Sequence, residues 1–250
     1  MTTKTPRSAM VLAAGLGKRL APLTDRLPKP LVKVCGRALI DHLLDRLVAA
    51  GVENAVVNLH HHAERLEAHL ADRARPRLHF SREATLLETG GGVVKALPLL
   101  GGGAFFVANA DVLWLDGTTP ALARLAAAWD ESTMDALLLM QPSVAARGYE
   151  GLGDYFLDPF GQLRRRGERE IAPFVFAGVQ LLHPRLFAGM AVERFSLNRV
   201  FDHAEANGRL FGIRHDGAWF HIGTMAGLAE AEAELAGGSG GLWAPLPIEQ

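Results

Sequence analysis

The sequence predicts an α/β protein with a mostly parallel, mixed sheet that helices cover on both faces. Apolar runs of strand length alternate with segments whose apolar residues recur at helical spacing, and this alternation is typical of such sheets. The 250 residues are 49% hydrophobic and 21% charged, which suits a globular chain with a substantial core. No linker divides the chain, so we expect one domain over residues 1–236 and a Gly/Ser/Pro-rich tail over residues 237–250.

The first half of the chain carries the clearest alternation. A first strand around Met10 ends at glycines, and apolar residues at helical spacing follow it. We expect helices at residues 39–48, 63–75, 90–100 and 121–129. We expect the other strands of this half at residues 52–59, 78–81, 105–111 and 135–140. Because parallel strands share a carboxyl edge, ligands are expected to bind beyond that edge.

From about residue 141 the chain becomes richer in short strands. The pattern predicts a hairpin over residues 155–166, with an Asp-Pro-Phe-Gly turn at its tip. Further strands are expected at residues 174–182 and 210–214, and further helices at residues 197–207 and 225–235. We expect these elements to extend the same sheet.

Charge and cysteine content exclude several classes of protein. The net charge of −1 provides no basic field for nucleic acid or for an anionic membrane. The single cysteine, Cys35, excludes an internal disulfide and fits a reducing compartment. A basic and apolar start imitates a secretion signal, but Lys18 and Arg19 occupy its end, so we interpret it as mature protein. No apolar stretch approaches the ~20 residues of a membrane span. We therefore expect a cytoplasmic protein, and the sequence does not indicate its oligomeric state.

The stretch from Met10 to Leu31 carries the strongest functional signal. A strand-like apolar run is broken by Gly-Leu-Gly at residues 15–17, and the cations Lys18, Arg19 and Lys29 follow. Glycines let backbone N–H groups approach an anion, and cations neutralise it. This arrangement predicts a phosphate-binding site after the first strand.

Two better-known phosphate motifs do not fit this stretch. A P-loop has Ser or Thr after its lysine, where this chain has Arg19, and a dinucleotide fingerprint has a third glycine where this chain has Leu20. The chain instead continues with Pro-Leu-Thr at residues 22–24 and Pro-Lys-Pro-Leu at residues 28–31. Together with Gly-Leu-Gly-Lys-Arg at residues 15–19, these segments resemble, in order and spacing, the signature of the sugar-1-phosphate nucleotidylyltransferases.

The resemblance implies a Rossmann-like fold of the nucleotide-diphospho-sugar transferase type and a defined reaction. A sugar-1-phosphate attacks the α-phosphorus of a nucleoside triphosphate, and pyrophosphate leaves. The sugar phosphate, with a second pKa near ~6, is already mostly dianionic at neutral pH and needs no general base. Cations and a metal ion lower the barrier by offsetting anionic charge. The resemblance places Arg19 and Lys29 on the phosphates as catalytic residues, and Ala13, Gly15 and Gly17 against the nucleotide.

A second motif, Leu-Glu-Thr-Gly-Gly-Gly at residues 87–92, matches the segment that closes over base and ribose in this family. The resemblance therefore implies nucleotide contacts for Thr89 and Gly90, and also for Asn58 in a Val-Asn segment. Glu88 has two interpretations, because its carboxylate suits either the paired donors of guanine or the start of the next helix. The motif and the residues after it are similar to those of N-acetylmuramate-1-phosphate uridylyltransferases, which recycle peptidoglycan sugars.

Asn-Ala-Asp at residues 109–111 matches the family's strand-end aspartate, so the resemblance implies that Asp111 holds Mg²⁺ together with substrate phosphates. The second metal ligand of the family lies in a Trp-x-Asp-x-Gly-Thr segment, but here residues 219–224 read Trp-Phe-His-Ile-Gly-Thr. Imidazole suits Mn²⁺, Co²⁺ or Zn²⁺ better than Mg²⁺. Three arrangements stay open: His221 binds a softer metal or a phosphate, Asp216 substitutes for it, or Asp111 alone anchors the ion. We favour the last.

The remaining candidates concern the sugar and a histidine run. The resemblance implies that Asp154 accepts a hydrogen bond from the sugar and that Gly178 leaves room beneath it. A hairpin position for Asp154 and close strand packing for Gly178 are the structural alternatives. Residues 60–62 are three consecutive histidines, which point in different directions and are not expected to form a metal site. Ser196 is expected to cap a helix.

The sequence thus predicts an enzyme that transfers a nucleotidyl group from a nucleoside triphosphate to a sugar-1-phosphate. UMP transfer to N-acetylmuramate-1-phosphate is the favoured interpretation. A mannose- or heptose-1-phosphate guanylyltransferase is the nearest alternative, since it shares the phosphate-handling residues. A non-catalytic nucleotide-binding homologue is a further alternative, which the replacement at His221 keeps open.

Overall fold

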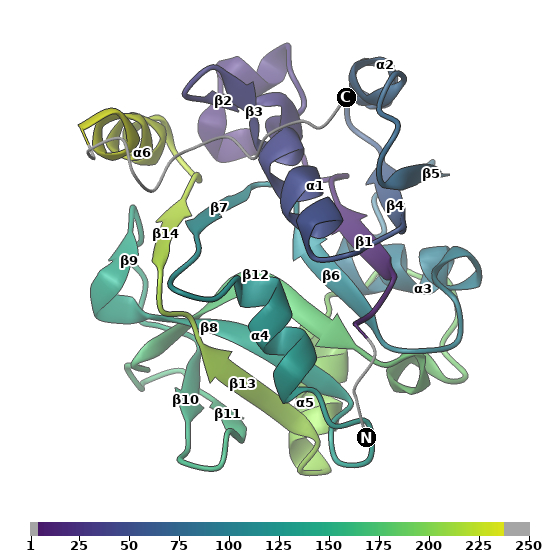
Figure 1. Cartoon of the computed structure of the whole chain (residues 1–250), viewed down its shortest axis with the longest axis vertical. Helices are drawn as coiled ribbons and strands as arrows, with labels where there is room; N and C mark the ends of the chain where they lie inside the picture. Colours follow the sequence, from purple (N-terminus) through teal and green to yellow (C-terminus); the bar gives the residue numbers. More distant parts are fainter. Residues whose placement is uncertain (1–4, 238–250) are drawn as a thin grey trace.

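The computed structural model describes residues 5–237, and a nine-stranded mixed sheet lies at its centre (Figure 1). The residues of the predicted tail beyond 237 lie outside the described part. The main path of the sheet has the order β11-β10-β12-β6-β1-β4-β5, and β8 and β13 extend it from β12. This confirms the predicted fold class.

The parallel half of the sheet comes from the first half of the chain. Its strands are β1 (Ser8–Leu12), β4 (Asn54–Leu59), β5 (Arg77–Arg82) and β6 (Phe105–Asn109). β1 lies between β4 and β6 and is parallel to both, so the carboxyl ends of these three strands meet at one edge. The apolar runs of β1, β4 and β6 form strands that are buried on both faces of the sheet, whereas the edge strand β5 is only partly buried.

The second half of the chain extends this sheet, as predicted. Its strands are β8 (Ala136–Pro142), β10 (Tyr155–Leu157), β11 (Leu163–Arg165), β12 (Phe174–Leu182) and β13 (Leu210–Arg214). β12 is antiparallel to β6, which makes the sheet mixed, and its register with β8 shifts between Phe176 and Gln180. β10 and β11 form the predicted hairpin.

Helices cover both faces of the sheet (Figure 1). One core cluster joins the sheet to α1 (Leu39–Ala49), α2 (Ala63–Leu70) and α4 (Ala121–Ala128). A second cluster on the opposite face joins it to α3 (Glu88–Leu100) and α5 (Asn198–Ala206). The largest difference from the predicted bounds is in α2, which ends at Leu70 and not at residue 75, because the chain returns to begin β5; several other bounds, such as the start of α3, differ by two residues.

A small second sheet was not predicted. It consists of β7 (Val112–Leu115), β14 (Ala218–His221) and β9 (Ala146–Arg147), in the order β7-β14-β9. A third core cluster packs it against α6 (Met225–Gly237) and against apolar residues of the 18–34 region. These strands are short, and β7 and β14 lie about 100 residues apart in the chain. No local sequence pattern therefore predicts their pairing. Within the described residues, no helix combines the length and apolar character that crossing a bilayer requires.

A tight hairpin of β2 (Lys33–Val34) and β3 (Arg37–Ala38) leads from the glycine-rich stretch into α1. Its two turn residues both have positive φ, 50° at Cys35 and 80° at Gly36. Turns of this kind strongly prefer Asn-Gly, because asparagine adopts the left-handed region more readily than other residues with a side chain. The exposed Cys35 therefore stands at a strained position.

We expect Cys35→Asn to increase the free energy of unfolding by about 0.5–1 kcal/mol, since it relieves this backbone strain. Urea denaturation of the two proteins under reducing conditions measures the difference. Cys35→Ser is the matched control, because it removes the thiol without the turn preference of asparagine. A Cys35→Asn variant no more stable than Cys35→Ser would show that the strain is absent.

Candidate active site

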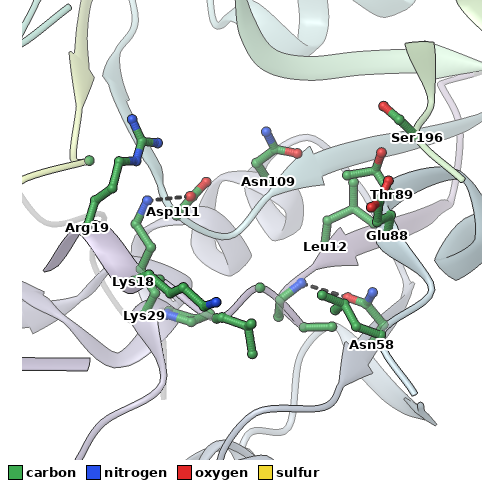
Figure 2. A pocket seen from close by; sticks show the side chains of 18 residues that line it. Leu12, Lys18, Arg19, Lys29, Asn58, Glu88, Thr89, Asn109, Asp111 and Ser196 are labelled. Carbon is green, nitrogen blue, oxygen red and sulfur yellow. Dashed lines mark hydrogen bonds and ion pairs between the residues drawn. The ribbon is translucent and has the colours of Figure 1, made fainter. Parts of the chain in front are cut away.

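A cleft of about 540 Å³ lies beyond the carboxyl ends of β1 and β6 (Figure 2). Cations and Asp111 lie at one end, while Thr89, Glu88 and Ser196 lie at the other, with Leu12 and Asn109 between them. Its lining residues come from seven parts of the chain: residues 12–19, Lys29, Pro30, Asn58, Leu86, Glu88, Thr89, Asn109, Asp111, Ser196 and Gly223. The predicted phosphate and nucleotide residues therefore meet, apart from Gly90.

The glycine turn at the phosphate end is held by the residues that follow it. Gly17 has a φ of 61°, and a Cβ there would lie 2.9 Å from Cγ2 of Thr24 and 3.0 Å from Cβ of Lys29. Thr24 Oγ1 donates a hydrogen bond of 3.0 Å to the Gly17 carbonyl. The Pro-Leu-Thr segment thus fixes the glycine turn. This contact explains why the motif has a threonine a few residues after its glycines. Lys18 and Arg19 follow in a 3-10 turn and line the cleft.

Lys29 is buried, with 8% of its surface exposed. Its Nζ lies 2.5 Å from Oδ2 of Asp111, which follows β6 directly. A buried ammonium group is stable only beside an opposite charge, so this ion pair fixes the 15–31 segment against the end of β6. The other carboxylate oxygen of Asp111 is not engaged by Lys29, and the side chain is 36% exposed.

His221 lies beside this ion pair, because β14 pairs it with Val112 of β7. Its ring packs against Trp219 and Tyr149, with centroids 5.9 and 6.3 Å away. A Cβ on Gly223 would lie 2.2 Å from His221 Nε2, so the glycine makes room for the imidazole.

Burial lowers the pKa of His221, the charges of Lys29 and Arg19 lower it further, and Asp111 acts in the opposite sense. The imidazole is therefore neutral near pH 7, which argues against the interpretation that it binds phosphate as a cation.

Asp216 is engaged elsewhere in this conformation. Its Oδ1 accepts a hydrogen bond of 2.6 Å from Arg124 of α4, and its carboxylate packs over Gly117. The alternative that Asp216 completes the metal site would require it to leave this ion pair. Within residues 5–237, no group of three or more His, Cys, Asp or Glu side chains is placed to hold a metal ion. Asp111 and His221 remain the two protein groups that could approach one.

At the end of the cleft opposite the cations, the floor is held together by the buried side-chain amide of Asn58. Asn58 Oδ1 accepts a hydrogen bond of 2.6 Å from the Ala13 N–H, and Asn58 Nδ2 donates one of 2.7 Å to Glu83 Oε1. Glu83 Oε2 in turn accepts from the Leu87 N–H at 2.9 Å. Ala13 and Asn58 line the cleft as predicted, but these polar groups hold the strands together. The sequence analysis missed Glu83, because nothing around it distinguishes it from a surface glutamate.

The glycines at the start of α3 pack closely against a distant segment. A Cβ on Gly90 would lie 2.3 Å from the Phe195 ring, and one on Gly91 would lie 2.0 Å from the Glu193 carbonyl oxygen. The N–H groups of Gly90 and Gly91 both donate to the Phe195 carbonyl, at 2.9 and 3.2 Å. These glycines accommodate residues 193–195. Gly90 does not line the cleft.

Thr89 and Ser196 form the wall of the cleft at the end opposite the cations. Thr89 Oγ1 accepts a hydrogen bond of 2.9 Å from the Leu197 N–H. Ser196 Oγ accepts from the Asn198 N–H at 3.2 Å, as expected at the start of a helix, and it also faces the cleft. Glu88 makes no capping hydrogen bond, and its Oε1 accepts from Nε and Nη2 of Arg194 at 2.9 and 2.6 Å.

The two predicted sugar residues have structural roles. Asp154 Oδ2 accepts a hydrogen bond of 2.9 Å from the Phe176 N–H, where β12 shifts register. Gly178 has a φ of 78°, and a Cβ there would lie 2.9 Å from Val112 Cγ1 and 3.0 Å from Asn109 Nδ2. Neither lines the cleft, and Gly178 is closely packed in its strand. Asn109, against which Gly178 packs, does line the cleft.

The three consecutive histidines bind backbone carbonyls. The rings of His60, His61 and His62 face the carbonyl oxygens of Glu83, Thr24 and Asp25, respectively, at 2.9, 3.3 and 3.2 Å. Two of them thus attach the Pro-Leu-Thr segment to the start of α2.

Comparison with known proteins agrees with this geometry. Residues 8–150 match the model of the family described as "Nucleotidyl transferase". The chain is 45% identical over 94% of its length to an N-acetylmuramate alpha-1-phosphate uridylyltransferase of Caulobacter vibrioides, of which it covers 99%. It is 35% identical over 92% of its length to the enzyme of the same name from Neisseria meningitidis, of which it covers 98%.

Among solved structures, the inositol-1-phosphate CTP transferase of T. maritima superposes with a TM-score of 0.76. The match covers 94% of this chain and 98% of that one at 20% identity, and it therefore supports the fold. The match over more than half of the chain and the identity to full-length relatives establish the family that the glycine turn, Lys29 and Asp111 indicate. The chain belongs to the nucleotidyl transferase family, in its sugar-1-phosphate branch.

Proposed function

We propose that this protein transfers UMP from UTP to N-acetylmuramate-1-phosphate and releases pyrophosphate. The observation that carries the proposal is the convergence of Arg19, Lys29 and Asp111 at one end of a cleft whose other end has room for a nucleoside. The reaction is carried over from the names of the relatives. We place it in the cytoplasm, in the recycling of peptidoglycan sugars.

The residues of the cleft supply electrostatic catalysis. The attacking sugar phosphate is already an anion, so the barrier comes from repulsion between anions and from charge that builds on the departing pyrophosphate. Lys29 is held rigidly by its ion pair, and Lys18 and Arg19 make no ion pair within the described residues. Lys29 is thus in place before the substrates arrive, so it stabilises the transition state with little reorganisation, and Arg19 adds positive charge at the same end of the cleft.

A divalent cation fits the site only in part. Asp111 offers a hard carboxylate oxygen, and Mg²⁺ characteristically uses one or two carboxylates together with substrate phosphates and water. Asp111 would hold the ion, which when bound would offset charge on the phosphates. His221 replaces a second anion by a neutral ring, so we propose that the protein alone binds the metal weakly and that the nucleotide completes its coordination.

The ion pair of Glu88 favours uracil over guanine. Its carboxylate would be the natural acceptor for the paired donors of guanine, but Arg194 already donates to its Oε1. In the guanylyltransferase alternative, guanine would have to share this carboxylate with Arg194 or displace the arginine.

A substrate panel tests the function directly. We expect pyrophosphate release to be fastest with UTP and N-acetylmuramate-1-phosphate, with kcat/KM at least about tenfold higher than with GTP. Turnover with GTP and mannose- or heptose-1-phosphate would instead establish the guanylyltransferase alternative. Tight nucleotide binding without any turnover would identify a non-catalytic homologue.

We expect Lys29→Met to lower kcat by about 10²–10³, the usual effect of removing one preorganised group that stabilises transition-state charge. Lys33→Met is the matched control, since Lys33 is an exposed lysine in the neighbouring hairpin. Steady-state kinetics measure both, and circular dichroism verifies folding. Equal losses in the two variants would remove Lys29 from the chemistry.

We expect His221→Asp to strengthen magnesium binding. A second carboxylate should lower the Mg²⁺ concentration for half-maximal activity by about tenfold, which corresponds to about 1.4 kcal/mol. Electron paramagnetic resonance with Mn²⁺ provides a readout besides activity: the wild type should bind Mn²⁺ tightly only with nucleotide, and the variant also without it. A variant with unchanged metal response would place His221 outside the metal site.

A further inference from the structure

Glu88 has an unusual backbone conformation at the wall of the cleft. Its φ is 60°, and among the described non-glycine residues only Cys35 and His62 also have positive φ. Neither of those two residues lines the cleft, whereas Glu88 does. A residue with a side chain is strained in this left-handed region, so the surrounding structure has to hold it there.

This conformation lies beside two backbone donors that the fold leaves unused. The Leu87 N–H donates to Glu83, and the N–H groups of Gly90 and Gly91 donate to the Phe195 carbonyl. Between them, the N–H groups of Glu88 and Thr89 have no acceptor within residues 5–237. Both residues line the cleft at the end that we assign to the nucleobase. Free N–H groups in the first turn of a helix are suited to bind carbonyl oxygens or anions.

The side chain of Glu88 is attached to a distant segment. Arg194 donates to Glu88 Oε1 from Nε and Nη2, across 106 residues of sequence. The neighbouring Phe195 carbonyl accepts from the glycines that follow Glu88, and the Phe195 N–H donates to the Leu87 carbonyl. Residues 193–197 thus clamp both the backbone and the side chain at the start of α3.

We propose that Arg194 is a positioning residue for the nucleobase. Through its ion pair it holds residue 88 in the left-handed conformation, which keeps the N–H groups of Glu88 and Thr89 exposed on the cleft wall. The ligand of these donors is a carbonyl oxygen on the edge of a nucleobase. The inference rests on the proposed function, since it requires a nucleotide in this cleft. The Glu88 carboxylate itself does not contact the base.

Substitutions at two positions test this inference through the KM for the nucleotide. We expect Arg194→Ala to raise the KM for UTP about fivefold with little change in kcat, which is the upper range for an exposed ion pair. Glu88→Ala should raise the KM for UTP at least as much, because alanine at positive φ is still strained and the ion pair with Arg194 is lost. Glu88→Gly should have a KM about fivefold lower than Glu88→Ala, because glycine adopts positive φ without strain.

The double variant separates positioning from direct contact. In the Glu88→Gly background, Arg194→Ala should have no further effect, since the backbone no longer needs the ion pair. A persistent effect would mean that Arg194 contacts the ligand itself. If Glu88→Gly is as impaired as Glu88→Ala, the carboxylate contacts the base and the inference is wrong.

Arg7→Ala is the charge-matched control. Arg7 forms an exposed ion pair with Glu53 at the opposite end of β1, with 58% of its side chain exposed against 68% for Arg194. The KM of Arg7→Ala for UTP should equal that of the wild type. If the wild type turns over no nucleotide, the proposed function fails. Calorimetric Kd values for UTP and GTP across the same variants then still decide the role of Arg194.

Discussion

The cleft depends on the ion pair between Lys29 and Asp111. An ammonium group with 8% exposure has lost most of its hydration, and only a close opposite charge makes that burial tolerable. The pair joins residues 82 positions apart, and Gly17 packs directly on Cβ of Lys29. The pair therefore joins the glycine turn, which Thr24 also holds, to the end of β6.

The opposite end is built on buried hydrogen bonds. Asn58 joins the ends of β1 and β4 to Glu83, which follows β5, and Glu83 joins them to the turn before α3. A Cβ on Gly92 would lie 2.9 Å from Asn58 Nδ2, so α3 approaches this network closely. Each of these groups, if left unpaired, would carry a desolvation cost, which makes the floor rigid. Selectivity is then left to the walls, at Thr89, Ser196 and Asn109.

Local signals explain what could be predicted from the sequence. The parallel strands, the glycine turn and Arg19 follow from patterns within a few residues, and the family resemblance supplied Lys29 and Asp111. Gly90 was assigned to the nucleotide because the contact that requires a glycine there, Phe195, lies 105 positions away. Glu83 was missed for the same reason, since only tertiary structure reveals its partners. The roles of these two residues depend on distant contacts, which no local sequence pattern predicts.

The replacement at His221 changes the charge balance of the phosphate end. Lys18, Arg19 and Lys29 lie near a single carboxylate there, and burial together with the charges of Lys29 and Arg19 lowers the pKa of His221, so its ring is neutral near pH 7. A bare divalent cation would be repelled by such a site, whereas a triphosphate would be attracted to it. Bound phosphates would make the net charge of this end of the cleft negative. A metal ion could then be coordinated by Asp111 and by the phosphates together. Under the proposed function, the substitution would therefore transfer part of the metal's coordination from the protein to the substrate.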